Sequence, residues 1–169
     1  MILETERLIL RKMTLNDLDS LHSVLSDTEA MKFYPTPFDV QMTQDWIKRN
    51  IRRYDRDGLG LCALILKQSG ELIGDSGLVL QTVEAEAVVE IGYHVRRDLW
   101  GQGLATEAAK ACRDYGFSQL GLTKLVSLIH PKNASSRRVA EKVGMTLHKT
   151  MEWQNKPVCI YAIERADEV

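Results

Sequence analysis

The fold is decided by Trp100-Gly101-Gln102-Gly103-Leu104-Ala105-Thr106, a stretch between an apolar run that ends at Val95 and an alanine-rich segment that begins at Leu104. The first amides of a helix lack partners within the helix and carry positive dipole character. Glycines at such a junction let the backbone approach a ligand closely, and Thr106 adds a hydroxyl at the helix start. The turn therefore predicts a site for a phosphorylated cofactor.

Two other phosphate-binding turns fit this stretch poorly, and a lone Gly-x-Gly more often marks an ordinary loop. A dinucleotide fingerprint needs a third glycine, and Thr106 stands in its place. That fingerprint also opens a βαβ unit, whereas the strands predicted before this turn form a meander. A Walker A loop is excluded because no Gly-Lys-Ser/Thr follows the glycines. The strand before the turn and the helix after it still favour a phosphate site.

Toward the N-terminus, the hydrophobic pattern predicts one strand followed by two helices. Residues 8–10 are typical of a short opening strand. Thr14 and Asp17 resemble a capping box at the start of the first helix. Asp39 is placed to cap the second helix, which we expect to end at Gly58.

The middle of the chain predicts strands, and the C-terminal half mixes helices with strands. Residues 61–66, 72–80 and 87–95 read as an antiparallel meander with turns at Ser69-Gly70 and Gln81–Glu86. The elements expected after it are a helix over 104–120, a strand over 124–129, a helix over 133–143, and strands over 145–150 and 157–164. This order predicts an α/β (α+β) fold in one domain, residues 1–169, with a mixed, mainly antiparallel sheet of about seven strands and helices on both faces.

Composition excludes several classes of partner. The chain has 169 residues and a formal net charge of −1, which gives no general attraction to nucleic acid or to a membrane. A local basic cluster is interpreted as a solvated helix face; it consists of Lys48, Arg49, Arg52, Arg53 and Arg56. No stretch is apolar enough to cross a bilayer, and no export signal is visible.

The cysteines and histidines predict neither a disulfide framework nor a metal site. Cys62, Cys112 and Cys159 are odd in number and widely spaced, so we expect a reducing, cytoplasmic location. The remaining histidines show no metal-ligand spacing and are expected to have structural or surface roles; they are His22, His130 and His148.

With this glycine turn the chain resembles a known family, the GNAT acetyltransferases. The acetyl-CoA pyrophosphate loop of that family reads Gln/Arg-x-x-Gly-x-Gly/Ala. Trp100 stands where that pattern has Gln or Arg, which removes a side-chain phosphate donor and leaves the backbone cradle. The resemblance covers nearly the whole chain and is to the branch with bacterial ribosomal-protein N-terminal (alanine/serine) acetyltransferases. The landmarks of that branch are Thr5-Glu6-Arg7-Leu8, Glu90-Ile91-Gly92-Tyr93, Gly101-Gln102-Gly103 and Asn133-Ala134-Ser135-Ser136.

The resemblance implies where acetyl-CoA binds. In this family two central strands, here residues 87–95 and 124–129, splay apart and leave unpaired backbone groups for the pantetheine arm and the thioester carbonyl. The cofactor-binding residues implied in this way are Tyr93, His94, Val95, Trp100, Gly101, Gln102, Gly103, Leu104, Ala105, Thr106, Asn133 and Ser136. Asn133 also stands at a helix start, so an ordinary N-cap is an equally good interpretation and is compatible with cofactor contact.

Transfer of an acetyl group to an amine requires the neutral amine, and Glu90 is the proposed base. About a tenth to a sixth of an α-amine is neutral at pH 7, against roughly one lysine in 2,500, so an N-terminal acceptor demands less of its base. Strand alternation puts Glu90, Gly92 and His94 on one face, where a carboxylate can take the proton through water. His94 is an alternative relay, and an ordinary solvent-facing role for Glu90 stays open.

The departing thiolate and the acceptor define the remaining site residues. Many members of the family carry a tyrosine on the helix after the asparagine, but Ala140 occupies that position here. Ser136 is the alternative donor to the thiolate, and its hydroxyl equally fits a role in satisfying helix-end amides. The expected acceptor contacts are Tyr34, Trp46 and Trp153, with Met31 and Phe33 beside them, although such residues are more often core.

These residues predict an N-acetyltransferase that works by direct attack of a primary amine on acetyl-CoA, most simply a protein N-terminal α-amine. The alternative acceptor is a small-molecule amine such as a polyamine, an amino acid or an aminoglycoside. An alternative of another class is a noncatalytic acyl-CoA-binding module that kept the cradle. No cysteine lies in a nucleophile motif, so no acyl-enzyme is expected. The sequence leaves open whether the chain forms a homodimer.

Overall fold

The computed structural model describes residues 2–166, which contain one eight-stranded sheet in the order β1-β2-β3-β4-β5-β6-β8-β7. The strands are β1 Leu3–Glu4, β2 Leu8–Arg11, β3 Gly60–Leu66, β4 Leu72–Val83, β5 Glu86–Val95, β6 Lys124–Ile129, β7 Thr146–Trp153 and β8 Lys156–Glu164. Neighbours pair antiparallel except β5 and β6, which are parallel. The predicted mixed, mainly antiparallel sheet is confirmed. It has one strand more than expected, because the two-residue β1 pairs with β2.

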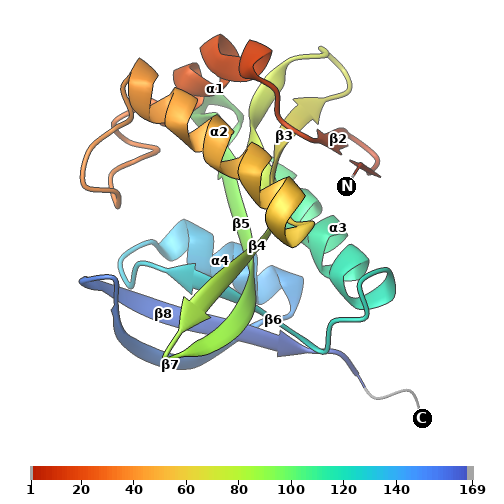
Figure 1. The fold of residues 1–169 in the computed structure, drawn as a ribbon, viewed down its shortest axis with the longest axis vertical. Coiled ribbons are helices and arrows are strands. Elements are labelled where there is room, and N and C mark those ends of the chain that lie inside the picture. The colour runs from red at the N-terminus through yellow and green to blue at the C-terminus, as the bar shows by residue number, and fades with distance from the viewer. Residues whose placement is uncertain (1, 167–169) are drawn as a thin grey trace.

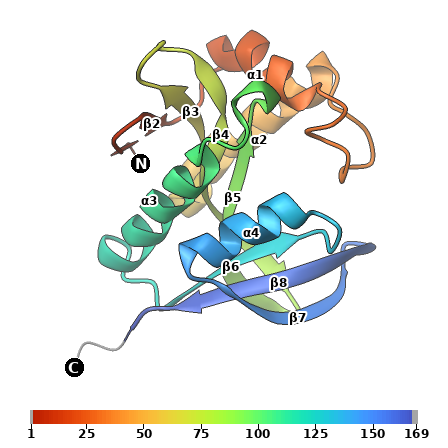
Figure 2. The same cartoon turned by 180° about the vertical axis from the view of Figure 1, so that it is seen from behind.

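The helices cover both faces of this sheet, as the sequence predicted. They are the 3₁₀ helix η1 Leu15–Asp17, α1 Leu18–Leu25, α2 Val40–Asp57, the 3₁₀ helix η2 Arg97–Leu99, α3 Leu104–Ser118 and α4 Ala134–Val143. Figure 1 shows α2 in front of the strands, and Figure 2, from behind, shows α3 and α4 on the opposite face. None of the helices within residues 2–166 is both long and apolar enough to cross a membrane.

The helix ends follow the chemistry of their residues. Asp39 accepts a hydrogen bond from the Met42 backbone N–H at 2.7 Å, which confirms the predicted cap of α2. Gly58 ends that helix in the left-handed region, at φ 68°. The capping pair is present too, because the Asp17 carboxylate accepts from the Thr14 N–H at 2.8 Å.

Strand alternation divides the core into two layers. Cys62, Leu78 and Ile91 belong to the cluster that packs against α3 and α4. Leu61 and Val79 point the other way, into the cluster packed against α1 and α2. Adjacent residues of one strand thus serve opposite faces, as a sheet covered by helices on both sides requires.

The prediction of a loop over Gln81–Glu86 is wrong. β4 continues to Val83 and β5 begins at Glu86, so only Glu84 and Ala85 form the turn, at φ 50° and 66°. Both residues adopt the left-handed conformation that a two-residue hairpin turn requires, despite having side chains. The polar residues that suggested a loop are paired across the ladder, as in Gln81 opposite Val88.

β5 and β6 diverge immediately after they meet. The ladder between β4 and β5 runs from Val83 opposite Glu86 to Gly74 opposite Val95, whereas β5 and β6 share only the register pair Glu90 and Val126. In Figure 2 the upper part of β5 rises away from β6, between α3 and α4. The splay implied by the family resemblance is therefore present. The Ile91 carbonyl still accepts a hydrogen bond from the Ser127 hydroxyl of β6 at 2.9 Å, and residues 92–95 have no ladder partner in β6.

Candidate active site

The glycine turn has the backbone that only glycine adopts readily. Gly101 and Gly103 both have φ 78°, and Gly103 is the N-cap residue of α3. A Cβ on Gly101 would meet nothing within 4 Å, and on Gly103 only Arg7 Nη2, at 3.7 Å. These glycines are needed for the conformation of the turn rather than for space inside the protein. The turn lies at the surface with the first amides of α3 behind it.

Residues 104–106 contribute backbone amides to this site, whereas their side chains are buried or partly buried. The Leu104 side chain is buried in the core, and Ala105 packs against the same core. Thr106 is partly buried in the first turn of α3. The arrangement offers helix N-terminal amides to an anion, which is the chemistry that a pyrophosphate needs.

Trp100 replaces a polar side chain of the family pattern and has its own role. Its indole N–H donates to the Val95 backbone carbonyl at 2.7 Å, although the residue is 46% exposed. The indole therefore ties the glycine turn to the last residue of β5 rather than to a phosphate.

Arg7 is a residue at this site that the sequence indicated only as a family landmark. Its Nη1 donates to the Gln102 backbone carbonyl at 2.9 Å, and its Nε donates to Glu107 at 2.7 Å. Glu107 also accepts from the Thr5 hydroxyl at 2.6 Å. The Thr5-Glu6-Arg7-Leu8 motif thus holds the glycine turn and brings a guanidinium beside it, next to the position that Trp100 left without a phosphate donor.

Asn133, Ser136 and Tyr93 meet at the start of α4. The Asn133 side chain accepts from the Ser136 N–H at 3.1 Å, so the N-cap interpretation is confirmed. Tyr93 donates to the Ser136 backbone carbonyl at 2.8 Å, and the Ser136 hydroxyl donates to Tyr93 Oη at 3.0 Å. Burial raises the pKa of Tyr93 to about 12. Ala140, where the family often has tyrosine, is buried, and a phenol from β5 reaches this helix instead.

Glu90 lies where β5 and β6 separate, on the face toward α2. Its carboxylate accepts from Gln81 Nε2 at 2.8 Å. Burial raises the pKa of Glu90, and the opposing effects of Gln81, the Leu128 backbone N–H and Arg53 do not cancel it. A carboxylate whose pKa is raised is a better proton acceptor near neutral pH than an ordinary one.

His94, on the same face, belongs to a hydrogen-bonded chain. Its Nδ1 lies 2.7 Å from Asp75 Oδ1, and its Nε2 lies 2.9 Å from the Tyr34 hydroxyl. Asp75 has 0% exposure, and its Oδ2 accepts from the Trp46 indole at 2.8 Å. Asp75 was missed from the sequence, although the polar pair Asp75-Ser76 inside an otherwise apolar strand was a visible signal.

Two of the predicted acceptor residues, Tyr34 and Trp46, belong to this hydrogen-bonded chain. Phe38 makes edge contacts with Tyr34 and Trp46, with ring centroids 5.8 Å and 5.5 Å apart. Lys156, at the β7–β8 turn, lies over the Tyr34 ring at 5.8 Å. Trp153, opposite Lys156 in the hairpin, donates its indole N–H to the Thr82 carbonyl at 2.9 Å. Met31 is buried in the α1–α2 core, and Phe33 stacks on His130. The side chains of Met31, Phe33 and Trp153 therefore lie outside the hydrogen-bonded chain.

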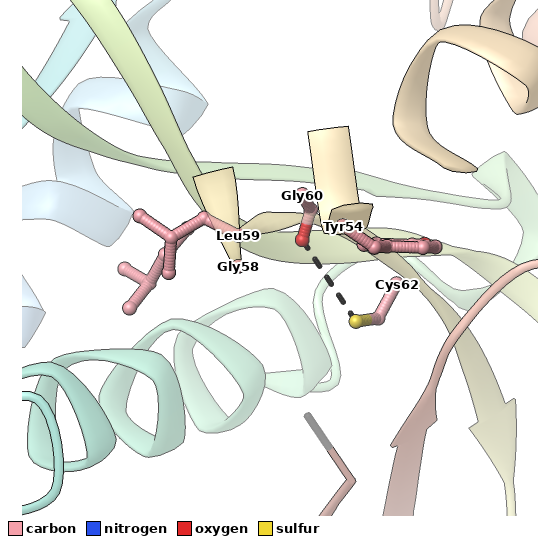
Figure 3. Close-up of a pocket in the computed structure, with 6 residues that line it drawn as sticks. Tyr54, Gly58, Leu59, Gly60 and Cys62 are labelled. Atoms are coloured by element: carbon pink, nitrogen blue, oxygen red, sulfur yellow. Dashed lines mark hydrogen bonds between the residues drawn. The ribbon is translucent and has the colours of Figure 1, made fainter. Parts of the chain in front are cut away.

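Two hollows elsewhere in the molecule do not coincide with these residues. One is a void of about 10 Å³ beside Tyr54, Gly60 and Cys62, drawn in Figure 3 with the contact between Gly60 O and Cys62 Sγ. That space is at the lower limit for one water molecule. The other, about 350 Å³, is polar and lies between Arg11, Asp17 and Arg96. Neither contains a residue of the glycine turn or of the Glu90 face.

Comparison of the sequence with known proteins identifies the family of this chain. A family model described as an acetyltransferase (GNAT) domain matches residues 7–146. Uncharacterized protein YkkB of Bacillus subtilis is 41% identical over 160 residues, which cover 94% of this chain and 93% of that protein. Uncharacterized N-acetyltransferase p20 of Bacillus licheniformis is 39% identical over 145 residues, which cover 84% of this chain and 80% of that protein. Spermidine N(1)-acetyltransferase of Escherichia coli is 25% identical over 82% and 72%.

Solved structures share the fold. An acetyltransferase of the GNAT family from Bacillus anthracis superposes with a TM-score of 0.81 at 29% identity, covering 97% of this chain and 98% of that one. RimL, a ribosomal alpha-N-protein acetyltransferase in complex with coenzyme A, gives 0.79 at 19% identity over 97% and 98%. The aminoglycoside acetyltransferase AAC(6')-Ib, also with coenzyme A, gives 0.79 at 21% identity over 94% and 95%. At the last two identities the likeness is one of fold alone.

Proposed function

The chain belongs to the acetyltransferase (GNAT) family and is an N-acetyltransferase of that type, and from this premise we propose that it acetylates the α-amine of a protein N-terminus with acetyl-CoA. The observation that carries the proposal is the joint placement of two features on β5: its splayed end leads into the glycine turn, and Glu90 marks the point of divergence. A noncatalytic acyl-CoA-binding module is disfavoured, because relatives covering most of the chain are named N-acetyltransferases.

The glycine turn fits the pyrophosphate of acetyl-CoA. Left-handed backbone at Gly101 and Gly103 opens the first amides of α3, and Arg7 adds a positive charge beside them. The Ile91 carbonyl accepts from the Ser127 hydroxyl of β6, and the Val95 carbonyl accepts from the Trp100 indole. Between them, the backbone of residues 92–94 has no β6 ladder partner and can pair with an extended pantetheine arm. This pairing places the thioester near Glu90 and the start of α4.

Glu90 acts as the base in this proposal. It takes a proton from the acceptor ammonium through water, and the neutral amine attacks the thioester carbonyl directly. Ser136 then stabilises the departing thiolate by a hydrogen bond, for which its hydroxyl turns away from Tyr93. An acyl-enzyme is not needed, and the three cysteines are buried.

Charge on the acceptor side supports a peptide α-amine over a polyamine. Arg49 lies over the Trp46 ring at 5.9 Å, one helical turn from Arg53. Burial lowers the pKa of Arg53, and Arg49 lowers it further, so positive charge on this face is already crowded. A polyamine adds several more positive charges there, whereas a peptide brings one. The 25% identity to a spermidine acetyltransferase keeps the small-molecule amine as the second candidate.

The test is amine-dependent release of coenzyme A thiol with a panel of acceptors. The panel contains peptides with a free N-terminal alanine or serine, the same peptides with a blocked N-terminus, spermidine and an aminoglycoside. We expect turnover with the free peptides and none with the blocked ones. Higher kcat/KM with spermidine or the aminoglycoside would replace the protein N-terminus by a small-molecule acceptor.

A further inference from the structure

Tyr34, His94 and Asp75 form a hydrogen-bonded chain that the proposed function does not use. Asp75 is fully buried, and both of its carboxylate oxygens are occupied: Oδ1 by His94 Nδ1 at 2.7 Å and Oδ2 by the Trp46 indole at 2.8 Å. An indole N–H only donates, and a carboxylate only accepts. Nδ1 of His94 therefore carries the hydrogen, and Nε2 is left to accept from the Tyr34 hydroxyl 2.9 Å away.

The hydrogen-bonded chain ends with Tyr34, on the proposed acceptor side of the site. Tyr34 is partly buried between Phe38, His94 and Lys156, and His94 shares its strand face with Glu90. A buried carboxylate without a counter-charge is costly, and a protonated His94 would neutralise Asp75. The geometry therefore favours His94 as the group that accepts a proton entering at Tyr34.

The charged and titratable groups around His94 come from several elements. Asp75 on β4, Glu90 on β5 and Tyr34 in the loop before α2 act on His94 directly. Arg53 on α2 acts on Glu90, and Lys156 on β8 lies over the Tyr34 ring. Burial alone would lower the pKa of His94, but Asp75 and Glu90 together raise it above its ordinary value. His94 is consequently a stronger base than an ordinary histidine.

Amide formation from an ammonium ion removes two protons from the same nitrogen. The first must leave before attack, and the second leaves after attack, when the nitrogen bonded to the acetyl carbon is again positively charged. One carboxylate cannot accept both unless it is deprotonated between the two steps. The face of β5 toward α2 presents two acceptors, Glu90 and the end of the Tyr34 chain.

Resting on the proposed function, we propose that Tyr34 is a catalytic residue that takes the second proton from the acceptor nitrogen while it passes its own hydroxyl proton to Nε2 of His94. One N–H bond of the acceptor breaks and one Tyr34 O–H bond forms; the original O–H bond breaks and an Nε2–H bond forms. No electron is transferred to or from the protein. Asp75 is a positioning residue that fixes the tautomer and neutralises the imidazolium, and the proton later returns to solvent through Tyr34.

The first test measures the chain without turnover. Ring NMR of the histidines, with His94→Gln to assign the signals, is recorded across pH for the wild-type protein and for Asp75→Asn. We expect wild-type His94 to carry its hydrogen on Nδ1 and to titrate above an ordinary histidine, and to titrate at lower pH in Asp75→Asn. Identical titrations in the two proteins would overturn the proposal.

The second test follows kcat against pH with acetyl-CoA and a peptide bearing a free N-terminal alanine. We expect kcat of Tyr34→Phe to fall by about 10²-fold or more. In Asp75→Asn the acidic limb should move to lower pH while the maximum falls, because a weaker base is deprotonated earlier. A purely structural role would lower kcat equally at all pH values. Phe38→Leu, which disturbs the contact with the Tyr34 ring but removes no hydroxyl, should change KM and leave the shape of the profile intact.

The two failures are distinguishable. No thiol release by the wild-type protein with any amine of the panel would contradict the proposed function. An active wild-type enzyme whose Tyr34→Phe variant has the same kcat profile would reject the role of Tyr34 and leave the proposed function standing.

Discussion

Glu90 is the single side chain on which the proposed chemistry depends most. In Glu90→Gln the hydrogen bond with Gln81 can be kept, but the carboxylate that accepts the proton is lost. We expect kcat to fall by about 10²- to 10⁴-fold with the acetyl-CoA dissociation constant unchanged. Steady-state thiol release and calorimetry check both quantities. Glu86→Gln, at the exposed start of the same strand, is the control, and wild-type rates in Glu90→Gln across pH would remove Glu90 from the mechanism.

Ser136 is assigned to the departing thiolate, and a neighbouring serine provides a matched control. Ser136→Ala removes the hydroxyl but keeps the backbone N–H that donates to Asn133, so the cap of α4 survives. A hydrogen bond to a charged group contributes about 1.5–3 kcal/mol, so kcat should fall roughly 10- to 100-fold. Ser135→Ala, exposed on the same helix turn, should leave kcat unchanged. Equal rates for the two variants would assign the hydroxyl of Ser136 to α4 alone.

Among the elements, the glycine turn before α3 is the one whose conformation controls cofactor binding. Valine at position 103 would face the cost of a left-handed backbone, about 1–2 kcal/mol, and would tilt the first amides of α3. We expect Gly103→Val to fold and to show no detectable acetyl-CoA binding by calorimetry. Gly58→Val imposes the same backbone cost at φ 68°, with nothing within 4 Å of the added Cβ, at the end of α2. If both variants bind acetyl-CoA, the turn is not the cradle.

Sequence periodicity located the elements around that turn because each has one apolar face or a clear end signal. β6 begins and ends at the predicted residues, and Asp39 and Gly58 bound α2 as expected. The error at Gln81–Glu86 arose because polar residues in a paired, solvent-facing ladder look like a loop. Tertiary contacts explain the rest: the pairing of Tyr93 with Ser136 and of Asp75 with His94 joins distant residues, and no local pattern encodes it.

At the scale of the whole molecule, Glu107 connects the N-terminal strands to α3. Burial alone would raise the pKa of Glu107, but hydrogen bonds from Thr5 and Arg7 lower it overall. A lowered pKa contributes stability above the unfolded-state pKa, and that contribution is lost as pH falls through the folded-state pKa. Glu107→Gln should therefore cost about 1–3 kcal/mol at pH 7 and progressively less below about pH 4.

Urea unfolding of both proteins at pH 7, 4 and 3 measures this difference. Glu6→Gln, an exposed carboxylate beside Arg7, is the control and should unfold like the wild-type protein at each pH. A stability difference for Glu107→Gln that stays constant across this range would mean that the carboxylate charge contributes nothing.

The three cysteines lie in the interior, each at most 3% exposed. Burial raises the pKa of the Cys62 thiol to about 11 and that of Cys112 to about 12, so neither is a thiolate near neutral pH. A colorimetric thiol reagent added to the folded enzyme should therefore have almost no protein background, and its signal should come from the product alone. Denaturant then exposes three cysteine thiols per chain, and their reaction with the same reagent measures the enzyme concentration in the same sample.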